Sequence, residues 1–335
     1  MRVAVVGAGS WGTTMAVLAA RRGFPTLLWT RRPQLAADLQ RHRENPAYLP
    51  GVSLPDIIVP TAHLEHIAEA SVILVAVPSH GFRRVLGAAA DHLAADAVIV
   101  SLSKGIEAGT LLRMTQIAHQ VLPGHDPARI GVLTGPNLAT EIAAGQPAAT
   151  VVAMGDPSAA GRVQDLLMSD TLRVYTNPDV VGCEAAGAVK NVMAIAAGMA
   201  AGLGYGDNTL AALITRALAE LTRLGLALGG KPPTFAGLAG MGDLIATCTS
   251  EKSRNHRVGV GLGRGRSLEE ITSEMRMVAE GVKTAAAVLA LADRHRVEMP
   301  IVAEVGHVLH EGKAPGDAVA TLMTRDARGE LDGIS

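Results

Sequence analysis

Cysteine, aromatic side chains and net charge are all scarce in this sequence. Its 335 residues include only two cysteines, Cys183 and Cys248, and neither has a second Cys or a His at metal-ligand spacing. We therefore expect buried, reduced thiols, no disulfide and no metal site. The formal net charge is -1, which provides no basic footprint for a nucleic acid or an anionic membrane. Any anionic ligand must be bound by a local cluster of positive groups.

Long hydrophobic runs are also missing. No stretch approaches about 20 uninterrupted, strongly apolar residues, so no membrane span is expected. The apolar run at the N-terminus ends at Gly7, which is too short for a signal peptide. We therefore expect a soluble, cytoplasmic protein. Apolar residues still make up 48% of the chain, and its length suits two domains.

The first half of the chain alternates short β-rich runs with segments of helical periodicity. The runs are continuous apolar stretches bounded by Gly, Pro or Ser, which is typical of buried strands joined by βαβ crossovers. They lie at 2–6, 26–29, 72–77, 97–103, 130–135, 150–155 and 172–176. The pattern predicts an α/β fold with a doubly wound, Rossmann-type domain over 1–180. After residue 182 the periodicity is helical throughout, which predicts an all-α domain over 181–335.

A glycine-rich turn follows the first expected strand. Gly7-Ala8-Gly9-Ser10-Trp11-Gly12 has the pattern GxGxxG and stands directly before a helical segment. In that context the first glycine makes the turn, the second lets the backbone approach a pyrophosphate, and the third lets helix and strand pack closely. The helix N-terminus favours the pyrophosphate charge. The turn predicts a dinucleotide site, with a purely structural turn as the alternative.

The residues after the second expected strand bear on which dinucleotide is bound. A site selective for NAD usually has Asp or Glu there for the ribose 2′-hydroxyl. This chain has Thr30, Arg31 and Arg32 instead, and its next carboxylate is Asp38. Two guanidinium groups suit a 2′-phosphate, so we expect NADPH as the preferred cofactor and NADH as a second possibility. The alternative is that both arginines are solvated residues at a helix start.

Candidate catalytic groups lie at strand ends and in one apolar helix. Lys104 ends an apolar strand, at the edge where ligands gather in an open parallel sheet, although a surface lysine is the default there. Lys190 lies in AAGAVKNVMAIAAG, where a buried lysine is costly unless it is paired or its pKa falls. Asp243, among glycines and apolar residues, is the expected partner of Lys190. Such a lysine is a candidate acid–base group, or a structural residue that extends to solvent.

A polar cluster precedes another expected helix. Ser253, Arg254 and Asn255 combine side-chain donors, positive charge and the N–H groups of a helix start. That combination suits a phosphate, and an ordinary helix cap with solvated arginines is the alternative.

Together these motifs resemble those of bacterial NAD(P)-dependent glycerol-3-phosphate dehydrogenases over essentially the whole chain. The resemblance is carried by VVGAGSWGT, VPSH, SKGIE, GPNLATEIAAG, GAVKNVMAIAAGM, AGMGDLIATCTS, KSRNHRVG and VAEGVKT. It implies a C-terminal domain like that of 6-phosphogluconate dehydrogenase, and a homodimer. It also implies reversible reduction of dihydroxyacetone phosphate to sn-glycerol 3-phosphate, which supplies glycerophospholipid biosynthesis. The partner would be a small phosphorylated molecule.

The resemblance also implies roles for individual residues. Lys190 would be the catalytic proton donor and acceptor, with Lys104 and Asp243 in the same pocket. Substrate contacts are implied at Lys104, Gly135, Asn137, Lys190, Asn191, Asp243, Thr247, Ser253, Arg254 and Asn255. Cofactor contacts are implied at Ser10, Trp11, Arg31, Lys104, Ala139, Arg254, Val278 and Glu280. The three motif glycines and Arg32 are added to these from the residue patterns described above. Asn137 departs from the bacterial pattern, which commonly has Ser or Thr there, so its contact stays open.

Two other functions remain as alternatives at this point. A related two-domain dehydrogenase could act on a 2-oxo or 3-hydroxy acid, but it would not need the Ser253–Asn255 cluster. A sensor that binds NADP(H) without turnover would have no reason to bury Lys190 with an acidic partner.

Overall fold

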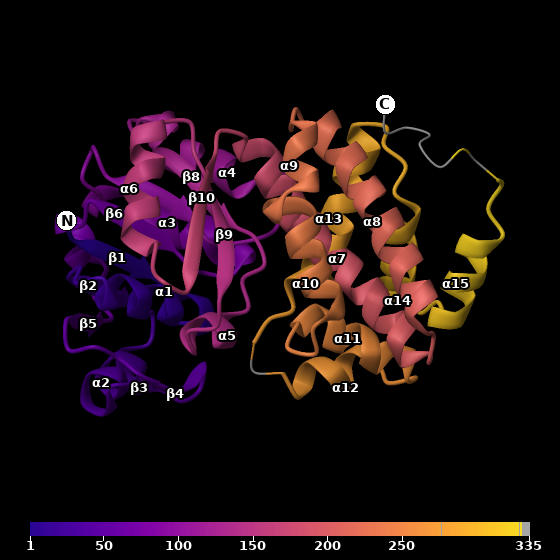
Figure 1. Cartoon of the computed structure of the whole chain (residues 1–335), viewed down its shortest axis with the longest axis horizontal. Coiled ribbons are helices and arrows are strands. Elements are labelled where there is room, and N and C mark those ends of the chain that lie inside the picture. The colour runs from indigo at the N-terminus through magenta and orange to yellow at the C-terminus, as the bar shows by residue number, and fades with distance from the viewer. Residues whose placement is uncertain (276, 328, 330–335) are drawn as a thin grey trace. The chain divides into compact units, whose positions relative to one another are not determined.

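A computed structural model describes residues 1–275, 277–327 and 329 (Figure 1). Internal contacts divide the chain into two compact units. Unit 1 comprises Met1–Ser103 and Met114–Val180, and unit 2 comprises Lys104–Arg113 and Val181–Ser335. The domain boundary expected near residue 180 stays a prediction. Segment Lys104–Arg113, which the sequence places in the first domain, groups with unit 2.

Unit 1 is built on an eight-stranded sheet in the order β10-β9-β8-β7-β6-β1-β2-β5. Its strands are β1 (Val3–Val6), β2 (Thr26–Trp29), β5 (Ile58–Thr61), β6 (Val72–Val75), β7 (Val98–Ser101), β8 (Ile130–Thr134), β9 (Ala148–Ala153) and β10 (Leu172–Asn177). All neighbours are parallel except β8 and β9. Val3 pairs with Thr26 on one side and Val72 on the other, so β1 lies in the middle of the parallel part. The predicted α/β fold with a Rossmann-type sheet is confirmed.

Every strand expected from an apolar run is present, but β5 was not expected. Its sequence contains Pro60, which cannot donate a ladder hydrogen bond, and its Val59 is 54% exposed. Because β5 is an edge strand that pairs only with β2, it tolerates both features. A separate hairpin, β3 (Glu44–Asn45) and β4 (Leu49–Ser53), also lacks an apolar run.

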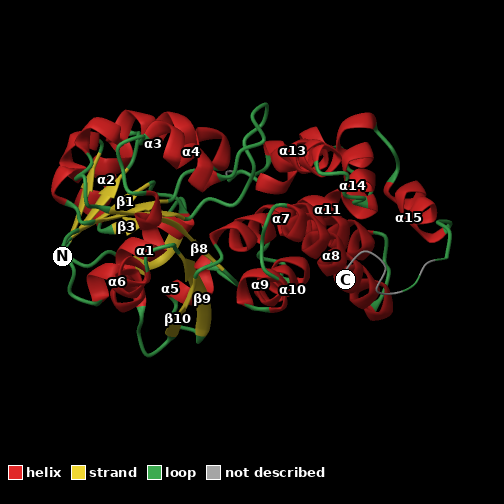
Figure 2. Ribbon diagram, turned by 90° about the horizontal axis from the view of Figure 1, so that it is seen from above, coloured by secondary structure: helices red, strands yellow, loops and turns green. Residues whose placement is uncertain are grey.

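Helices cover both faces of the sheet. Figure 2 shows α3 (Phe82–Ala89) and α4 (Met114–Val121) on one face, with α1 (Ser10–Arg21) and α6 (Pro157–Leu167) on the other. The remaining helices of unit 1 are α2 (Pro33–His42), α5 (Ala139–Ala143) and the 3₁₀ turns η1 (Leu64–Glu69), η2 (Ser79–Gly81), η3 (Ala90–His92) and η4 (Pro127–Arg129). Strands β1, β6 and β7 are apolar on both faces, as expected for strands of a parallel sheet that helices cover on both sides. Their buried residues pack against α1 and α6 in one hydrophobic core.

Among its described residues, unit 2 contains helices and loops but no named strand (Figure 1). Its helices are α7 (Val180–Gly202), α8 (Asp207–Ala227), α9 (Pro232–Ala236), a π-helical turn η5 (Leu238–Gly242), α10 (Asp243–Thr249), α11 (Arg254–Gly263), α12 (Leu268–Ser273), α13 (Glu280–Arg294), α14 (Pro300–Glu311) and α15 (Pro315–Met323). The long periodic stretch after Ser267 is divided between α12 and α13. Ser267 and Glu270 form a capping box that starts α12.

Helix α7 is the central helix of unit 2. It is long and apolar enough to cross a membrane by composition alone, but 89% of its most apolar window is buried inside the protein. Its small residues let α11 approach closely: a Cβ at Gly198 would overlap the His256 carbonyl, and one at Gly259 would overlap the Ile195 carbonyl. Because α7 carries Lys190 and α11 begins at Arg254, this glycine contact sets the spacing between the two sequence motifs.

Candidate active site

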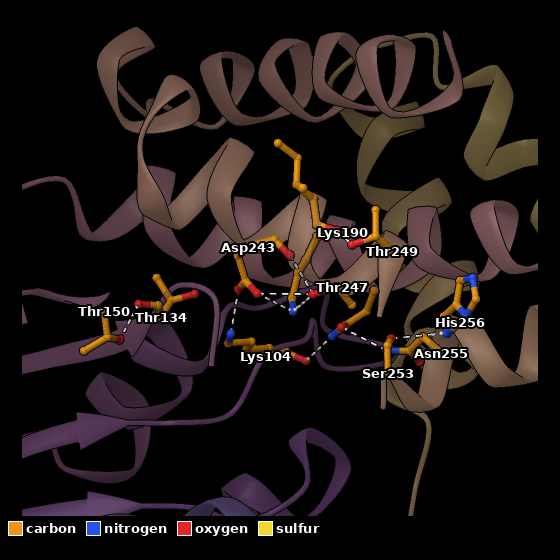
Figure 3. Close-up of polar contacts among 12 residues, drawn as sticks. Lys104, Thr134, Thr150, Lys190, Asp243, Thr247, Thr249, Ser253, Asn255 and His256 are labelled. Carbon is orange, nitrogen blue, oxygen red and sulfur yellow. Dashed lines mark hydrogen bonds and ion pairs between the residues drawn. The ribbon is translucent and has the colours of Figure 1, made fainter. Parts of the chain in front are cut away.

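Two lysines share one buried carboxylate in unit 2. Lys190 Nζ lies 2.6 Å from Asp243 Oδ1, and Lys104 Nζ lies 2.6 Å from Asp243 Oδ2 (Figure 3). Lys190 Nζ also donates to Thr247 Oγ1 at 2.6 Å. Asp243 itself is 1% exposed and Lys190 is 6% exposed. The pairing expected between Lys190 and Asp243 is present, and Lys104 joins it.

Local sequence explains how these side chains converge. Asp243 begins α10, directly after the π-helical turn, and Thr247 follows one helical turn later. The Thr247 hydroxyl therefore reaches both Asp243 and Lys190. Lys190 extends from α7, which is apolar apart from Glu184, Lys190 and Asn191. A charged group in such a helix requires a partner, which α10 supplies.

Burial shifts the ionisation of this cluster. Desolvation lowers the pKa of Lys104 to about 8, with the adjacent Asp243 opposing the shift and Lys190 adding to it. Burial by itself would raise the pKa of Asp243, but the two lysines outweigh it, so that pKa lies below its ordinary value. Asp243 is therefore ionised, and Lys104 changes charge near pH 8. A cluster of this kind can stabilise negative charge and exchange a proton.

Two asparagines connect the cluster to neighbouring helices. Asn255 Oδ1 accepts a hydrogen bond from Gly281 N at 2.9 Å, and Asn255 Nδ2 donates to Asn191 Oδ1 at 2.9 Å. Asn191 Nδ2 donates to the Lys104 carbonyl at 3.4 Å. The α13 N–H can only donate, so it fixes the orientation of the Asn255 amide and, through it, that of Asn191. Both residues were expected as substrate contacts, and both have defined structural partners here.

The expected phosphate cluster forms the start of α11. Ser253 caps the helix and accepts a hydrogen bond from His256 N. Arg254 is exposed, and its guanidinium donates to the Val278 carbonyl at 2.6 Å. A helix N-terminus with an exposed guanidinium beside it suits a phosphate. Val278 and Glu280 were expected as cofactor contacts. Val278 accepts the hydrogen bond from Arg254, and Glu280 follows two residues later.

The glycine-rich turn in unit 1 has the geometry that its pattern predicts. Gly7 has φ +124°, where a Cβ would lie 2.5 Å from the Ala76 carbonyl oxygen. A Cβ at Gly12 would overlap the Gly7 carbonyl, whereas the space beside Gly9 is open within 4 Å. Ser10 and Trp11 form the first turn of α1. The open backbone at Gly9, next to a helix N-terminus, fits the pyrophosphate of a dinucleotide.

The two arginines after β2 differ in their surroundings. Arg32 stacks its guanidinium on the Tyr48 ring at 5.4 Å and donates to the Tyr48 hydroxyl at 3.2 Å. Arg31 is exposed, and no side-chain contact of Arg31 is found in the described part of the chain. Tyr48 was not expected from the sequence, because nothing in its spacing links it to Arg32. The two arginines therefore differ in whether another side chain of the protein already contacts the guanidinium.

The remaining expected contacts lie in unit 1. Gly135 has φ +128° at the end of β8. Asn137 has both amide atoms buried without a protein partner among the described residues. The Ala139 carbonyl accepts a hydrogen bond from Thr14 at 3.3 Å. A buried amide without a protein partner is costly, so Asn137 has the capacity to bind a polar ligand or water.

Sequence reasoning missed one buried ion pair, Arg113 with Glu184, at a distance of 2.5 Å. Glu184 gave a signal comparable to that of Lys190, since it is a charge within the same apolar helix. Among the described residues, no group of three His, Cys, Asp or Glu side chains could hold a metal ion.

The sheet, the dinucleotide turn and the buried lysine–aspartate cluster define a two-domain oxidoreductase that uses a nicotinamide dinucleotide.

Comparison with known proteins identifies the family. Residues 2–160 match the N-terminal family model of NAD-dependent glycerol-3-phosphate dehydrogenase, and residues 179–320 match its C-terminal model. A glycerol-3-phosphate dehydrogenase [NAD(P)+] of Sphingopyxis alaskensis is 51% identical over 96% of each chain. One from Moorella thermoacetica is 50% identical over 98% of each chain. The chain belongs to the NAD-dependent glycerol-3-phosphate dehydrogenase family.

Solved structures agree with this assignment. The glycerol-3-phosphate dehydrogenase of Coxiella burnetii superposes with a TM-score of 0.93 at 37% identity, covering 97% of this chain and 99% of that one. A ketopantoate reductase from Ralstonia eutropha shares the fold alone, with a TM-score of 0.60 at 14% identity. That likeness concerns the fold and not the substrate.

Proposed function

We propose that the protein catalyses reversible reduction of dihydroxyacetone phosphate to sn-glycerol 3-phosphate, with NADPH as the preferred cofactor and NADH accepted. The observation that carries the proposal is the Lys190–Asp243–Lys104 cluster, in a chain about half identical to enzymes named for this reaction. The product would supply glycerophospholipid biosynthesis. The alternative of a non-catalytic sensor gives no reason for a lysine pair on one buried carboxylate.

Lys190 would donate the proton that completes the reduction. When bound, the cofactor supplies a hydride to the ketone carbon. Negative charge then develops on the carbonyl oxygen, and the Lys190 ammonium can stabilise it and deliver a proton to it. Asp243 and Thr247, both 2.6 Å from Lys190 Nζ, hold the ammonium in one position. The alcohol oxidation runs through the same groups in reverse, with neutral Lys190 accepting the proton.

Lys104 would add a second positive charge to the same pocket. Its link to Asp243 Oδ2 leaves Oδ1 for Lys190, so the carboxylate orients both ammonium groups. Remote from the reacting carbon, Arg254, Ser253 and the N–H groups of α11 would bind the substrate phosphate. Binding energy from that phosphate would orient the ketone.

Unit 1 would hold the dinucleotide at the glycine turn, with its pyrophosphate against the start of α1. Arg31 would bind the 2′-phosphate. The buried amide of Asn137 would form a hydrogen bond with a polar group of the bound ligands. We also propose a cytoplasmic homodimer that does not span a membrane. The burial of α7 in the core of unit 2 supports the last point.

The test is NADPH oxidation by the purified protein with three substrates: dihydroxyacetone phosphate, pyruvate and ketopantoate. We expect turnover with the phosphorylated ketone and almost none with the two oxo acids. Turnover of an oxo acid in preference would favour the related dehydrogenase, and binding of NADPH without any turnover would favour a sensor.

Arg254→Ala tests the phosphate site within the same assay. Removing a charge-assisted phosphate contact should raise KM for dihydroxyacetone phosphate by about 100-fold, since such bonds contribute about 1.5–3 kcal/mol or more. An unchanged KM would place the phosphate elsewhere. Lys252→Ala, two residues away and exposed, is the matched control and should leave KM unchanged.

A further inference from the structure

Lys104 is delivered to the cluster by a segment that leaves unit 1 and returns to it. The chain passes into unit 2 between Ser103 and Lys104 and passes back between Arg113 and Met114. Strand β7 ends just before this segment and α4 begins just after it, both in unit 1. Lys104 therefore keeps its place beside Asp243 only if the Lys104–Arg113 segment is attached firmly to unit 2.

The segment is a closed loop with its own hydrogen bonds. Ile106 and Arg113 form an isolated antiparallel bridge. Glu107 N donates to the Leu112 carbonyl at 2.9 Å, and Leu111 N donates to the Glu107 carbonyl at 3.0 Å. Leu111 has φ +60°, a strained conformation for a side chain of this kind that the closed loop maintains. Because Ile106 is bridged to Arg113, fixing Arg113 also fixes the backbone next to Lys104.

Besides the contacts of Lys104, residues at both ends of this loop attach it to unit 2, and Leu111 between them packs against the core of that unit. Ile106 is 5% exposed within the hydrophobic core of unit 2. At the far end, Arg113 Nη1 lies 2.5 Å from Glu184 Oε2, with side-chain exposures of 14% and 4%. Glu184 is on α7, the same helix that carries Lys190. An ion pair this well buried gains little net stability, because desolvation opposes the attraction, but losing one partner leaves an uncompensated buried charge. Its geometric effect is to tie the loop to α7.

We propose that Arg113 and Glu184 are positioning residues for the reaction: their ion pair fixes the Lys104 loop to α7 and so holds Lys104 at a constant distance from Lys190. Neither residue needs to touch the substrate. Both lysines are then held in place by unit 2 alone. The inference rests on the proposed function, because it gives Lys104 a part in that reaction.

A double-mutant cycle tests whether Arg113 acts through Lys104. We expect Arg113→Ala to lower kcat by about 100-fold, the cost of a misplacement of about 1 Å, with KM changed much less. In a Lys104→Ala background the same change should cost less than about threefold, since no lysine remains to be positioned. Arg113→Lys, which keeps the charge, should recover part of kcat. Equal losses of kcat in both backgrounds would overturn the proposal.

Chemical labelling of lysine gives a second readout that needs no turnover. The rate of Lys104 acylation, followed by mass spectrometry of the whole purified protein, should rise at least about tenfold in Arg113→Ala and Glu184→Gln as the loop loosens. Lys190 labelling should change little. Lys313→Ala, which removes another partly buried ion pair of unit 2, is the control and should leave Lys104 labelling unchanged. Unchanged Lys104 labelling in the two test variants would contradict the anchor.

The outcomes separate this inference from the proposed function. If the wild-type protein does not reduce dihydroxyacetone phosphate, the proposed function fails, and the labelling experiment still reports on the anchor. If the wild type is active but Lys104→Ala is as active, Lys104 has no part in the reaction, and the positioning role is wrong. The proposal is also rejected if the loss of activity in each variant parallels the fall in its unfolding temperature while Lys104 labelling stays unchanged. The Arg113–Glu184 ion pair would then have a purely structural role.

Discussion

Lys190 Nζ lies 2.6 Å from Asp243 Oδ1, on a carboxylate whose other oxygen is held at the same distance by Lys104. One buried negative charge thus faces two lysines. The excess positive charge is available to an oxygen that becomes negative during reaction, in surroundings where burial strengthens electrostatic interactions. The three residues come from α7, α10 and the Lys104–Arg113 loop, so the cluster depends on how unit 2 folds.

Lys190→Ala should lower kcat for dihydroxyacetone phosphate reduction by about 10²–10⁴-fold, the usual contribution of a general acid. The Kd for NADPH, measured by fluorescence, should change less than about threefold, because the proposed cofactor contacts lie elsewhere. Lys313→Ala controls for loss of a lysine from unit 2. A Lys190→Ala enzyme with near-normal turnover would remove Lys190 from the proton-donor role.

The pH profile should report Lys104. Its pKa is lowered to about 8, so it loses its positive charge as the pH rises through that value, and kcat/KM for ketone reduction should fall there. Because the lysines share Asp243, the apparent pKa belongs to the coupled cluster. In Lys104→Met the remaining activity should lack this limb near pH 8. An identical limb in that variant would assign the titration to another group.

The same shift predicts a stability effect of known sign. The folded-state pKa of Lys104, about 8, lies below the ordinary value of 10.5. Between these values the unfolded chain binds more protons than the folded one, so this group makes stability rise with pH across that window. Lys104→Met should flatten the rise in a series of urea denaturation curves from pH 8 to 10. A steeper rise in the variant would contradict the depressed pKa.

Arg31 and Arg32 should contribute unequally to cofactor choice. Arg32 already stacks on Tyr48, whereas Arg31 is exposed at the end of β2. Arg31→Ala should therefore raise the Kd for NADPH by at least about tenfold, as expected for one charge-assisted phosphate contact, and leave NADH almost unchanged. Arg32→Ala should have the smaller effect on the ratio of the two Kd values. Equal effects of both substitutions, or none, would refute the assignment to Arg31.

The fold could be predicted well where burial determines the sequence pattern. Strands β6 and β7 are buried on both faces, so their apolar runs identify them, whereas the edge strand β5, with Pro60 and an exposed Val59, has no such run. The helical periodicity of α7 and α8 likewise reflects their packing. The antiparallel pairing of β8 with β9 has no local signal, because pairing direction depends on the path of the chain between strands.

The site could be predicted only in part. A lysine in the apolar α7 needs a partner, which led from Lys190 to Asp243. No local pattern shows that Lys104, 139 positions away from Asp243 in sequence, takes the other carboxylate oxygen, because its loop groups with unit 2. Nor could spacing reveal that Asn255 is hydrogen-bonded to Gly281 and Asn191. Contacts between distant segments are fixed by tertiary packing.

Glu220 should make the stability of the protein fall as the pH rises toward neutrality. This carboxyl of α8 is 2% exposed and accepts hydrogen bonds from Ile301 N and Val302 N at the start of α14, at 2.8 and 3.4 Å. Desolvation raises its pKa from 4.5 to about 7, against the opposing effect of those hydrogen bonds. Its stabilising contribution is complete below pH 4.5 and is lost as the pH rises through 7, a change of about 3 kcal/mol.

Glu220→Gln tests this directly, since Gln keeps an acceptor for Ile301 N but cannot ionise. The variant should be more stable than the wild type at pH 8, and the difference should shrink or reverse at pH 5, as measured by urea denaturation at both values. Glu274→Gln, at an exposed ion pair, is the matched control and should change stability by less than about 1 kcal/mol at either pH. The opposite result is that Glu220→Gln lowers the free energy of unfolding, relative to the wild type, more at pH 8 than at pH 5. That result would show that the charged carboxylate is the favoured cap of α14.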